Sequence, residues 1–144
     1  MTVVVERVRA PGHVEPASAT WSNALRIGAE IVMSGATASA PSLAAPSGAG
    51  ATDGWGAYEQ TRAALQKLLD HVQAAGGNVR NIYKLVIYLT DMNDKDEVGR
   101  ARRDFFQAPY PCSTLVEVKG LVHPQLRVEV DAWARLDVDL SLCR

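Results

Sequence analysis

Side chains that are able to take part in catalysis are concentrated in the last third of the chain. Cys112 and Ser113 follow Pro111, and Glu129 lies in a later apolar stretch. A carboxylate can orient or deprotonate a water molecule, so Glu129 is our first candidate catalytic residue. The alternative is a charged side chain that is solvated or forms a salt bridge at a subunit interface. The Ser113 hydroxyl can hydrogen-bond a neutral substrate, and a serine that only begins a strand is an equally good interpretation.

Cys112 and three residues of the first third are further candidates for a binding site. A thiol nucleophile needs a nearby base and a lowered pKa. No histidine is adjacent to Cys112, so we expect a buried, inert thiol near the binding cleft. Trp21 can stack on an unsaturated ligand or serve as a plain interface aromatic. Ser34-Gly35 can offer backbone N–H groups to a substrate or mark a sharp exit from a strand.

The other polar candidates favour structural roles. His13 and His123 are expected to be solvated turn residues, and His71 is expected at the edge of a helix. Three arginines form a small basic group: Arg100, Arg102 and Arg103. A solvated helix face explains this group, because no set of aromatic residues that would stack RNA bases accompanies it.

Composition and charge exclude several classes of protein. The chain has 144 residues, of which 47% are hydrophobic and 22% charged, and a formal net charge of −1. These values are typical of one globular domain over residues 1–144 and give no broad attraction to nucleic acid or to membrane lipid. No apolar run approaches the roughly 18 residues of a membrane span. Cys112 and Cys143 are too few for a disulfide framework or a zinc site, so we expect a cytoplasmic protein.

Periodicity and turn residues predict six strands and two helices in the order β-β-β-α-β-α-β-β. The strands are expected at residues 3–9, 24–27, 30–34, 82–89, 114–118 and 127–135, and the helices at 53–75 and from residue 94 onward. Asp53 is expected to cap the first helix, and Asp94-x-x-Glu97 resembles a capping box for the second. Residues 36–54 are expected to form a long mobile loop, and residues 137–144 a peripheral tail.

The last predicted strand alternates between two kinds of side chain. The apolar set is Val128, Val130, Ala132 and Ala134, and the other set is Arg127, Glu129, Asp131, Trp133 and Arg135. Because alternate residues of a strand point to opposite faces, the apolar set is expected to face the two helices. The second set suits a face that meets another subunit.

Six short motifs resemble those of a known family in their order and spacing. They are Met33-Ser34-Gly35, Glu59-Gln60-Thr61, Ala74-Ala75-Gly76-Gly77, Tyr88-Leu89-Thr90-Asp91, Pro111 with Val116-Glu117-Val118, and Val128-Glu129-Val130-Asp131-Ala132. Together they resemble the YjgF/Rid family of small enamine/imine deaminases, and the resemblance spans about residues 21–134. The resemblance implies an α+β, chorismate-mutase-like protomer with two helices on one face of its sheet, assembled as a homotrimer with clefts between subunits. It also implies hydrolysis of enamines or imines, such as 2-aminoacrylate, to ketones and ammonia without metal or organic cofactor.

Some of the family's site residues are kept in this sequence, and others are replaced. Glu129 matches the family's acidic residue on the last strand, and Ser34-Gly35 matches its Ser-Gly step. Trp21 replaces a family tyrosine and loses its hydroxyl, while Gly99 replaces an asparagine on the second helix. The segment between Gly35 and the first helix is longer than in the family, which would admit a larger substrate.

The main departure is Ser113. The deaminase branch of the family has an arginine here that pairs with the substrate carboxylate, and a hydroxyl cannot imitate that bidentate contact. We therefore expect poor turnover of 2-aminoacrylate. Whether Arg26, Arg62 or Arg127 supplies the missing cation is open.

Two functions follow from these observations. The first is a cofactor-free deaminase or hydrolase that acts on an enamine, an imine or a related unsaturated small molecule. The alternative is a non-catalytic homotrimer that binds a metabolite or another protein in the same cleft.

Overall fold

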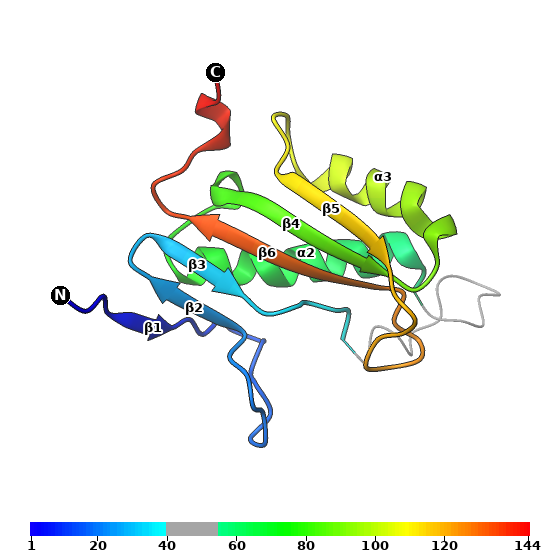
Figure 1. The fold of residues 1–144 in the computed structure, drawn as a ribbon, viewed down its shortest axis with the longest axis horizontal. Coiled ribbons are helices and arrows are strands. Elements are labelled where there is room, and N and C mark those ends of the chain that lie inside the picture. Colours follow the sequence, from blue (N-terminus) through cyan, green and yellow to red (C-terminus); the bar gives the residue numbers. More distant parts are fainter. Residues whose placement is uncertain (40–54) are drawn as a thin grey trace.

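The computed structural model describes residues 1–39 and 55–144. Within these ranges the strands are β1 (Val5–Arg7), β2 (Ala24–Ile27), β3 (Glu30–Met33), β4 (Ile82–Leu89), β5 (Cys112–Glu117) and β6 (Val128–Arg135). The helices are α2 (Ala57–Ala74) and α3 (Lys95–Phe105), with short 3₁₀ turns η1 (Val79–Asn81), η2 (Met92–Asp94) and η3 (Leu140–Leu142). The strands form one sheet in the order β1-β2-β3-β6-β4-β5 (Figure 1).

The sheet is mixed, and the two helices lie on the same face of it (Figure 1). β4 and β5 run parallel, because α3 connects them as a crossover. The other neighbouring pairs are antiparallel. The predicted α+β architecture, with two helices covering one face of a six-stranded sheet, is confirmed.

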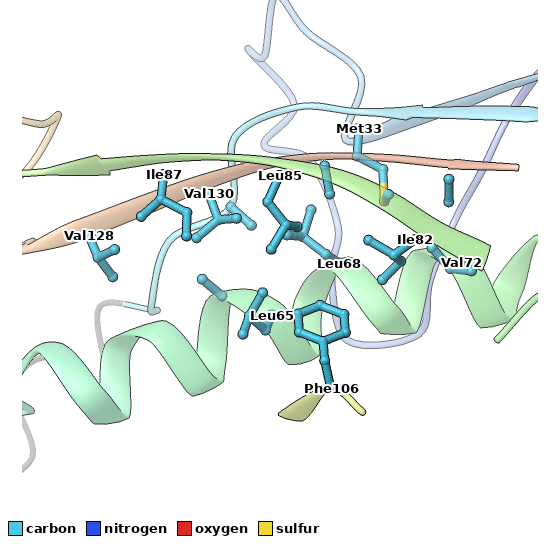
Figure 2. Packing of buried hydrophobic residues seen from close by; sticks show 14 of the residues in the cluster. Met33, Leu65, Leu68, Val72, Ile82, Leu85, Ile87, Phe106, Val128 and Val130 are labelled. Atoms are coloured by element: carbon cyan, nitrogen blue, oxygen red, sulfur yellow. The ribbon is translucent and has the colours of Figure 1, made fainter. Parts of the chain in front are cut away.

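The hydrophobic core fills the space between this face and the helices, as Figure 2 shows. Its largest fully buried side chains come from both helices and from β3, β4 and β6, and include Ile31, Leu65, Val72, Ile82, Leu85, Ile87, Val98 and Val130. In β6, buried and half-buried residues alternate along the whole strand. This alternation confirms that Val128 and Val130 face the helices, and it places Glu129 on the helix-free face.

A buried glutamine joins the first turn of α2 to the segment that leads into β6. The Gln60 side chain is only 1% exposed. Its Nε2 donates to the carbonyls of Trp55 at 2.9 Å and Gln125 at 3.0 Å, and its Oε1 accepts from the Arg127 N–H at 2.8 Å. One side chain therefore satisfies three backbone groups.

Helix starts depart from the sequence-based expectations. Asp53, the expected cap of the first helix, lies outside the described residues, and Gly56 is the N-cap of α2. The capping box expected at Asp94 is wrong, because its side chain makes no cap hydrogen bond. The Asp94 carboxylate instead accepts from Nη1 of Arg127 at 3.0 and 3.1 Å.

The loop expected over residues 36–54 begins later than predicted. Ala36 pairs with Val130 of β6 through two backbone hydrogen bonds of 2.8 and 3.0 Å, so the chain still follows the sheet there. Residues 40–54 lie outside the described residues. At the other end, the Val138 carbonyl accepts from Asn81 Nδ2 at 2.7 Å, which holds the start of the expected tail against η1.

Candidate active site

Four of the six residues proposed for the site line one cavity of about 850 Å³. They are Trp21, Ser34, Gly35 and Glu129. Ser34 and Gly35 come directly after β3, and Glu129 lies on β6, the strand that pairs with β3. The exit from one strand and the side chain of its neighbour therefore meet at this cavity.

Gly35 and the Glu129 carboxylate are in direct contact. A Cβ placed on Gly35 would overlap Oε1 of Glu129, and it would lie 2.9 Å from Cδ of Glu129 and 3.1 Å from Oδ1 of Asp131. No side chain larger than hydrogen fits at residue 35 unless the carboxylate moves. An alanine at residue 35 would therefore displace the Glu129 carboxylate from its present position.

The Glu129 carboxyl group holds its proton more tightly than an ordinary glutamate. Partial burial is the main cause of its raised pKa, and the negative charge of Asp131 adds to the effect. Lys67 acts in the opposite direction. A raised pKa brings a carboxylate closer to the range in which it accepts and returns a proton near neutral pH.

Lys67 of α2 also lines the cavity, although it is not among the residues singled out in the sequence. Burial lowers the pKa of its ammonium group, while Glu15 and Glu129 oppose that shift. Within residues 1–39 and 55–144 its Nζ has no hydrogen bond or ion pair. The only signal in the sequence was its spacing, since Lys67 lies one helical turn after Ala63, which also lines the cavity.

The Ser-Gly step offers fewer free groups than its sequence suggested. The Ser34 N–H donates to the Asn23 carbonyl at 2.9 Å, and its hydroxyl donates to the Ser22 carbonyl at 2.6 Å. Gly35 N–H has no backbone partner among the described residues, so it is the donor of this pair that remains open. The half-exposed Trp21 donates from Nε1 to Asn23 Oδ1 at 3.3 Å.

The segment before β2 forms a further wall of the cavity. Glu15 Oε1 accepts from the Asn23 N–H at 2.9 Å, and this bond is the main cause of the lowered pKa of Glu15. His13 lines the same wall, and its Nε2 lies 2.7 Å from Asp70 Oδ2. His13 was expected to be a solvated turn residue, but it joins the N-terminal segment to α2.

His71 lies in the interior of the protein, contrary to the expectation of a helix-edge position. It is 2% exposed, because the segment around His13 covers this part of α2 and brings the two imidazole rings to 5.5 Å. Its Nδ1 bonds the Lys67 carbonyl at 2.8 Å. Its buried Nε2 has no partner among the described residues, and burial lowers the His71 pKa.

Ser113 and Cys112, the other two candidates, do not line this cavity. Ser113 pairs with Leu85 of β4, whereas Glu129 pairs with Tyr88 of the same strand. Since Leu85 and Tyr88 are three residues apart, they point to opposite faces of the sheet. Ser113 therefore faces α3, where its Oγ accepts from Arg102 Nη1 at 2.9 Å, and Glu129 faces away from the helices.

The expectation of a buried thiol at Cys112 is wrong. Cys112 is exposed, because β5 is an edge strand and its residue 112 lies on the helix-free side, where no element of the described chain covers it. The neighbouring Ser113 and Thr114 are exposed as well. The open strand therefore presents its side chains to solvent in a single copy of the chain.

In residues 1–39 and 55–144, no three His, Cys, Asp or Glu side chains are grouped so that they would hold a metal ion. Over the same residues, none of the helices has the length and apolar content required to cross a lipid bilayer.

Comparisons with known proteins agree on one family. A family model described as Endoribonuclease L-PSP matches residues 12–136. The chain is 31% identical to the RutC family protein y4sK of Sinorhizobium fredii, covering 85% of this chain and 89% of that protein. It is 29% identical to the mouse 2-iminobutanoate/2-iminopropanoate deaminase, covering 91% and 89%.

Two solved structures are similar to this chain over most of its length. A Pseudomonas aeruginosa protein of unknown function is 49% identical and superimposes with a TM-score of 0.92, covering 99% of this chain and 100% of that chain. Escherichia coli TdcF with bound serine is 27% identical, with a TM-score of 0.70 and coverage of 92% and 97%.

Proposed function

Since the chain belongs to the YjgF/Rid family, whose model is described as Endoribonuclease L-PSP, we propose that the cavity around Glu129 hydrolyses an enamine, an imine or a related unsaturated small molecule. The observation that carries this proposal is the contact between Gly35 and a Glu129 carboxyl of raised pKa on the wall of a cavity of about 850 Å³. Relatives named as iminobutanoate and reactive intermediate deaminases support the reaction class.

The proposed reaction needs one group that moves a proton in both directions. An enamine first gains a proton from solvent on carbon and becomes an iminium ion. The Glu129 carboxylate then takes a proton from water while the water oxygen bonds to the iminium carbon, and the C=N electron pair moves to nitrogen, which gives a neutral carbinolamine. The protonated Glu129 gives its proton to the amine nitrogen and then takes the hydroxyl proton as the C–N bond breaks, so the products are a carbonyl compound and ammonia, and Glu129 finally returns one proton to solvent.

Three neighbours of Glu129 have supporting roles in this proposal. The Gly35 N–H is the donor that steadies negative charge as it develops. The positive charge of Lys67 attracts an anionic part of the substrate or the negative charge that develops on the leaving group. The exposed ring of Trp21 supplies an apolar face on which an unsaturated ligand stacks.

We further propose that the active assembly is a homotrimer in which β5 of one protomer closes the cavity of the next. The exposed edge strand supports this, because β5 pairs only with β4 within the described chain, and the open side of an edge strand is a surface for pairing. The arrangement also explains why Ser113 and Cys112 lie apart from Glu129 in one protomer, although all three are expected at the same cleft.

One residue favours a substrate other than 2-aminoacrylate. Ser113 cannot hold an α-carboxylate in the bidentate manner of an arginine. Keto acid release in a coupled serine dehydratase assay is expected to be stimulated weakly at most. Rapid stimulation would contradict this choice of substrate.

The decisive experiment compares the wild type with Glu129→Gln on imines made in situ by an amine oxidase and by an amino acid oxidase. The wild type is expected to shorten the lifetime of at least one imine, and Glu129→Gln to abolish that effect while ligand affinity persists. Because burial disfavours the ionised glutamate, the glutamine variant is expected to be as stable as the wild type at pH 7. If the wild type changes no imine lifetime yet binds ligands, the chain is a non-catalytic binder.

A further inference from the structure

The amine of Lys67, on the wall of the cavity around Glu129, differs from the other side-chain amines of the chain. It is half-buried, and it makes no hydrogen bond or ion pair with the residues that the structure describes. The other lysines are Lys84, Lys95 and Lys119. Lys84 donates to the Thr114 hydroxyl at 3.0 Å, whereas Lys95 and Lys119 are exposed. Lys67 is therefore the lysine whose amine is both partly desolvated and open to a ligand.

The N-terminal segment contributes to the partial burial of Lys67. Residues 12–16 line the cavity together with Lys67. This segment is fixed to α2 three residues further along the helix, where His13 Nε2 lies 2.7 Å from Asp70 Oδ2. The backbone carbonyl of Lys67 accepts from His71 Nδ1 at 2.8 Å. Lys67 thus lies between a fixed helix and a fixed wall of the cavity.

Burial makes the neutral amine of Lys67 easier to form than that of an ordinary lysine. Loss of hydration lowers the pKa of its ammonium group, although the charges of Glu15 and Glu129 act in the opposite direction. Only the neutral amine carries the electron pair that attacks carbon. A lysine that is desolvated in a pocket is the form of this residue that acts as a nucleophile toward carbonyl groups in proteins.

Two neighbouring groups suit the condensation of an amine with a carbonyl compound. This reaction needs an acid that helps the carbonyl oxygen leave as water, and a donor to that oxygen steadies its charge. The Glu129 carboxyl group lines the same cavity, and burial raises its pKa. The Gly35 N–H, which has no backbone partner among the described residues, lies beside this carboxyl group. Amine, acid and donor therefore occur in one cavity.

Exposed apolar side chains line the same cavity and indicate what kind of carbonyl compound it takes. They are Val14, Trp21 and Val122. An aromatic or unsaturated body packs on such surfaces, while a ligand without an apolar part gains nothing from them. An aldehyde is the most reactive carbonyl group toward an amine. An aldehyde with an apolar, unsaturated body therefore fits both the amine and the walls.

We propose that Lys67 is a covalent binding site for carbonyl compounds, at which its amine forms a Schiff base with an apolar aldehyde that occupies the cavity. The inference goes beyond the proposed hydrolysis. The carbonyl products of that reaction belong to the same chemical class, but the bond to Lys67 does not depend on the hydrolysis. The protonated Schiff base also keeps the positive charge that the proposed function uses at this position.

The bond forms in two steps. The Lys67 nitrogen first bonds to the carbonyl carbon, and the C=O electron pair moves to oxygen. The Glu129 carboxyl group gives its proton to that oxygen and takes one from nitrogen, which leaves a carbinolamine. The same carboxyl group then protonates the hydroxyl, the nitrogen electron pair forms the C=N bond, and water leaves. The products are the protonated Schiff base, the Glu129 carboxylate and water.

The test is reductive trapping of the full-length protein with benzaldehyde and cyanoborohydride at pH 7, followed by peptide mapping with mass spectrometry. Cyanoborohydride reduces a Schiff base to a stable benzylamine, and the map gives the initial rate at each lysine and at the N-terminal amine separately. Lys67 is expected to be benzylated at least about tenfold faster than each of the other three lysines, because a lowered pKa and a bound aldehyde both favour it. Lys67→Arg keeps the charge and is expected to lose this label. Lys84→Arg, at another half-buried lysine, is the matched control and is expected to label Lys67 at the wild-type rate.

A second variant tests the role of the surrounding charges. Glu15→Gln keeps the oxygen that accepts from the Asn23 N–H at 2.9 Å but removes a charge that raises the pKa of Lys67. Benzylation of Lys67 at pH 7 is therefore expected to become faster, and the pH at which its rate is half-maximal is expected to fall. A lysine with only a structural role would not show this change in pH profile.

Three results would overturn the inference. They are benzylation of Lys67 no faster than that of Lys95 and Lys119, a preference for Lys67 that persists after unfolding in urea, and an unchanged pH profile in Glu15→Gln. The two proposals fail separately. Imine hydrolysis that depends on Glu129, with no preferred label at Lys67, removes only the covalent site. Preferred labelling of Lys67 in a protein that hydrolyses no imine removes only the proposed activity.

Discussion

Gly35 and Glu129 are packed so closely that a methyl group on residue 35 would occupy the place of the Glu129 carboxylate. Gly35→Ala is therefore expected to push the carboxylate out of its position, to destabilise the protein by about 1–3 kcal/mol and to lower turnover of any imine substrate. Urea unfolding and the imine assay measure the two effects. Gly120→Ala is the matched control, since nothing lies within 4 Å of the Cβ position there. An alanine variant with wild-type stability and turnover would contradict the packing argument.

The charges around Glu129 are expected to set the acid limb of the pH–rate profile. A general base works in its deprotonated form, so the rate falls as pH drops through its pKa, and the raised pKa of Glu129 places that limb above the ordinary glutamate value. Asp131→Asn removes a charge that raises this pKa, so the limb is expected to move to lower pH. Lys67→Met removes a charge that lowers it, so the limb is expected to move to higher pH. Shifts in the same direction for both variants would contradict the assignment of Glu129 as the base.

Gln60 is expected to be worth more to stability than any exposed glutamine. Gln60→Leu leaves two carbonyls and the Arg127 N–H without their partners, and each buried unpaired group costs about 1–3 kcal/mol. The free energy of unfolding, measured in urea, is expected to fall by about 3 kcal/mol or more. Gln73→Leu on the exposed side of α2 is the control and is expected to stay within about 0.5 kcal/mol of the wild type.

His71 is expected to make the protein less stable in mild acid. Its folded-state pKa is lowered by burial, so the folded state resists the proton that the unfolded chain accepts at an ordinary pKa of about 6.5. The lowered pKa of His71 therefore has no effect on stability well above that pH. As the pH falls below it, the lowered pKa reduces the free energy of unfolding. Unfolding free energies measured between pH 5 and pH 8 are expected to fall more steeply for the wild type than for His71→Leu. Parallel curves would show that His71 takes up its proton freely, for instance through a rearrangement of His13 and Asp70.

The sequence predicted the sheet and its inner face well, because these depend on local and periodic patterns. The β-branched and aromatic residues of 82–89 indicated a buried strand, and the alternation around Glu129 indicated which side chains face the helices. The same reasoning failed at Cys112, because a β-rich segment has the same sequence pattern at the centre and at the edge of a sheet. Only strand order decides whether such a side chain is covered.

The candidate site was predicted only in part, for a related reason. Family motifs pointed to Ser34, Gly35 and Glu129, which do line one cavity. Lys67 was missed because helical periodicity predicts only which face of α2 is buried. It does not predict which other segments surround a long side chain at the edge of that face. Arg102 was read as part of a solvated face, since the sequence alone does not show that it reaches Ser113.

The opposite orientations of Ser113 and Glu129 have a consequence for symmetry. A contact that brings Ser113 of one copy to Glu129 of another joins two different surfaces, so it is heterologous and repeats head to tail until a ring closes. A two-fold dimer cannot form from it. In such a ring a protomer carrying Glu129→Gln still presents an intact β5 to the cavity of its neighbour. Mixed rings of wild-type and Glu129→Gln protomers would then keep one working cleft for each wild-type protomer that they contain.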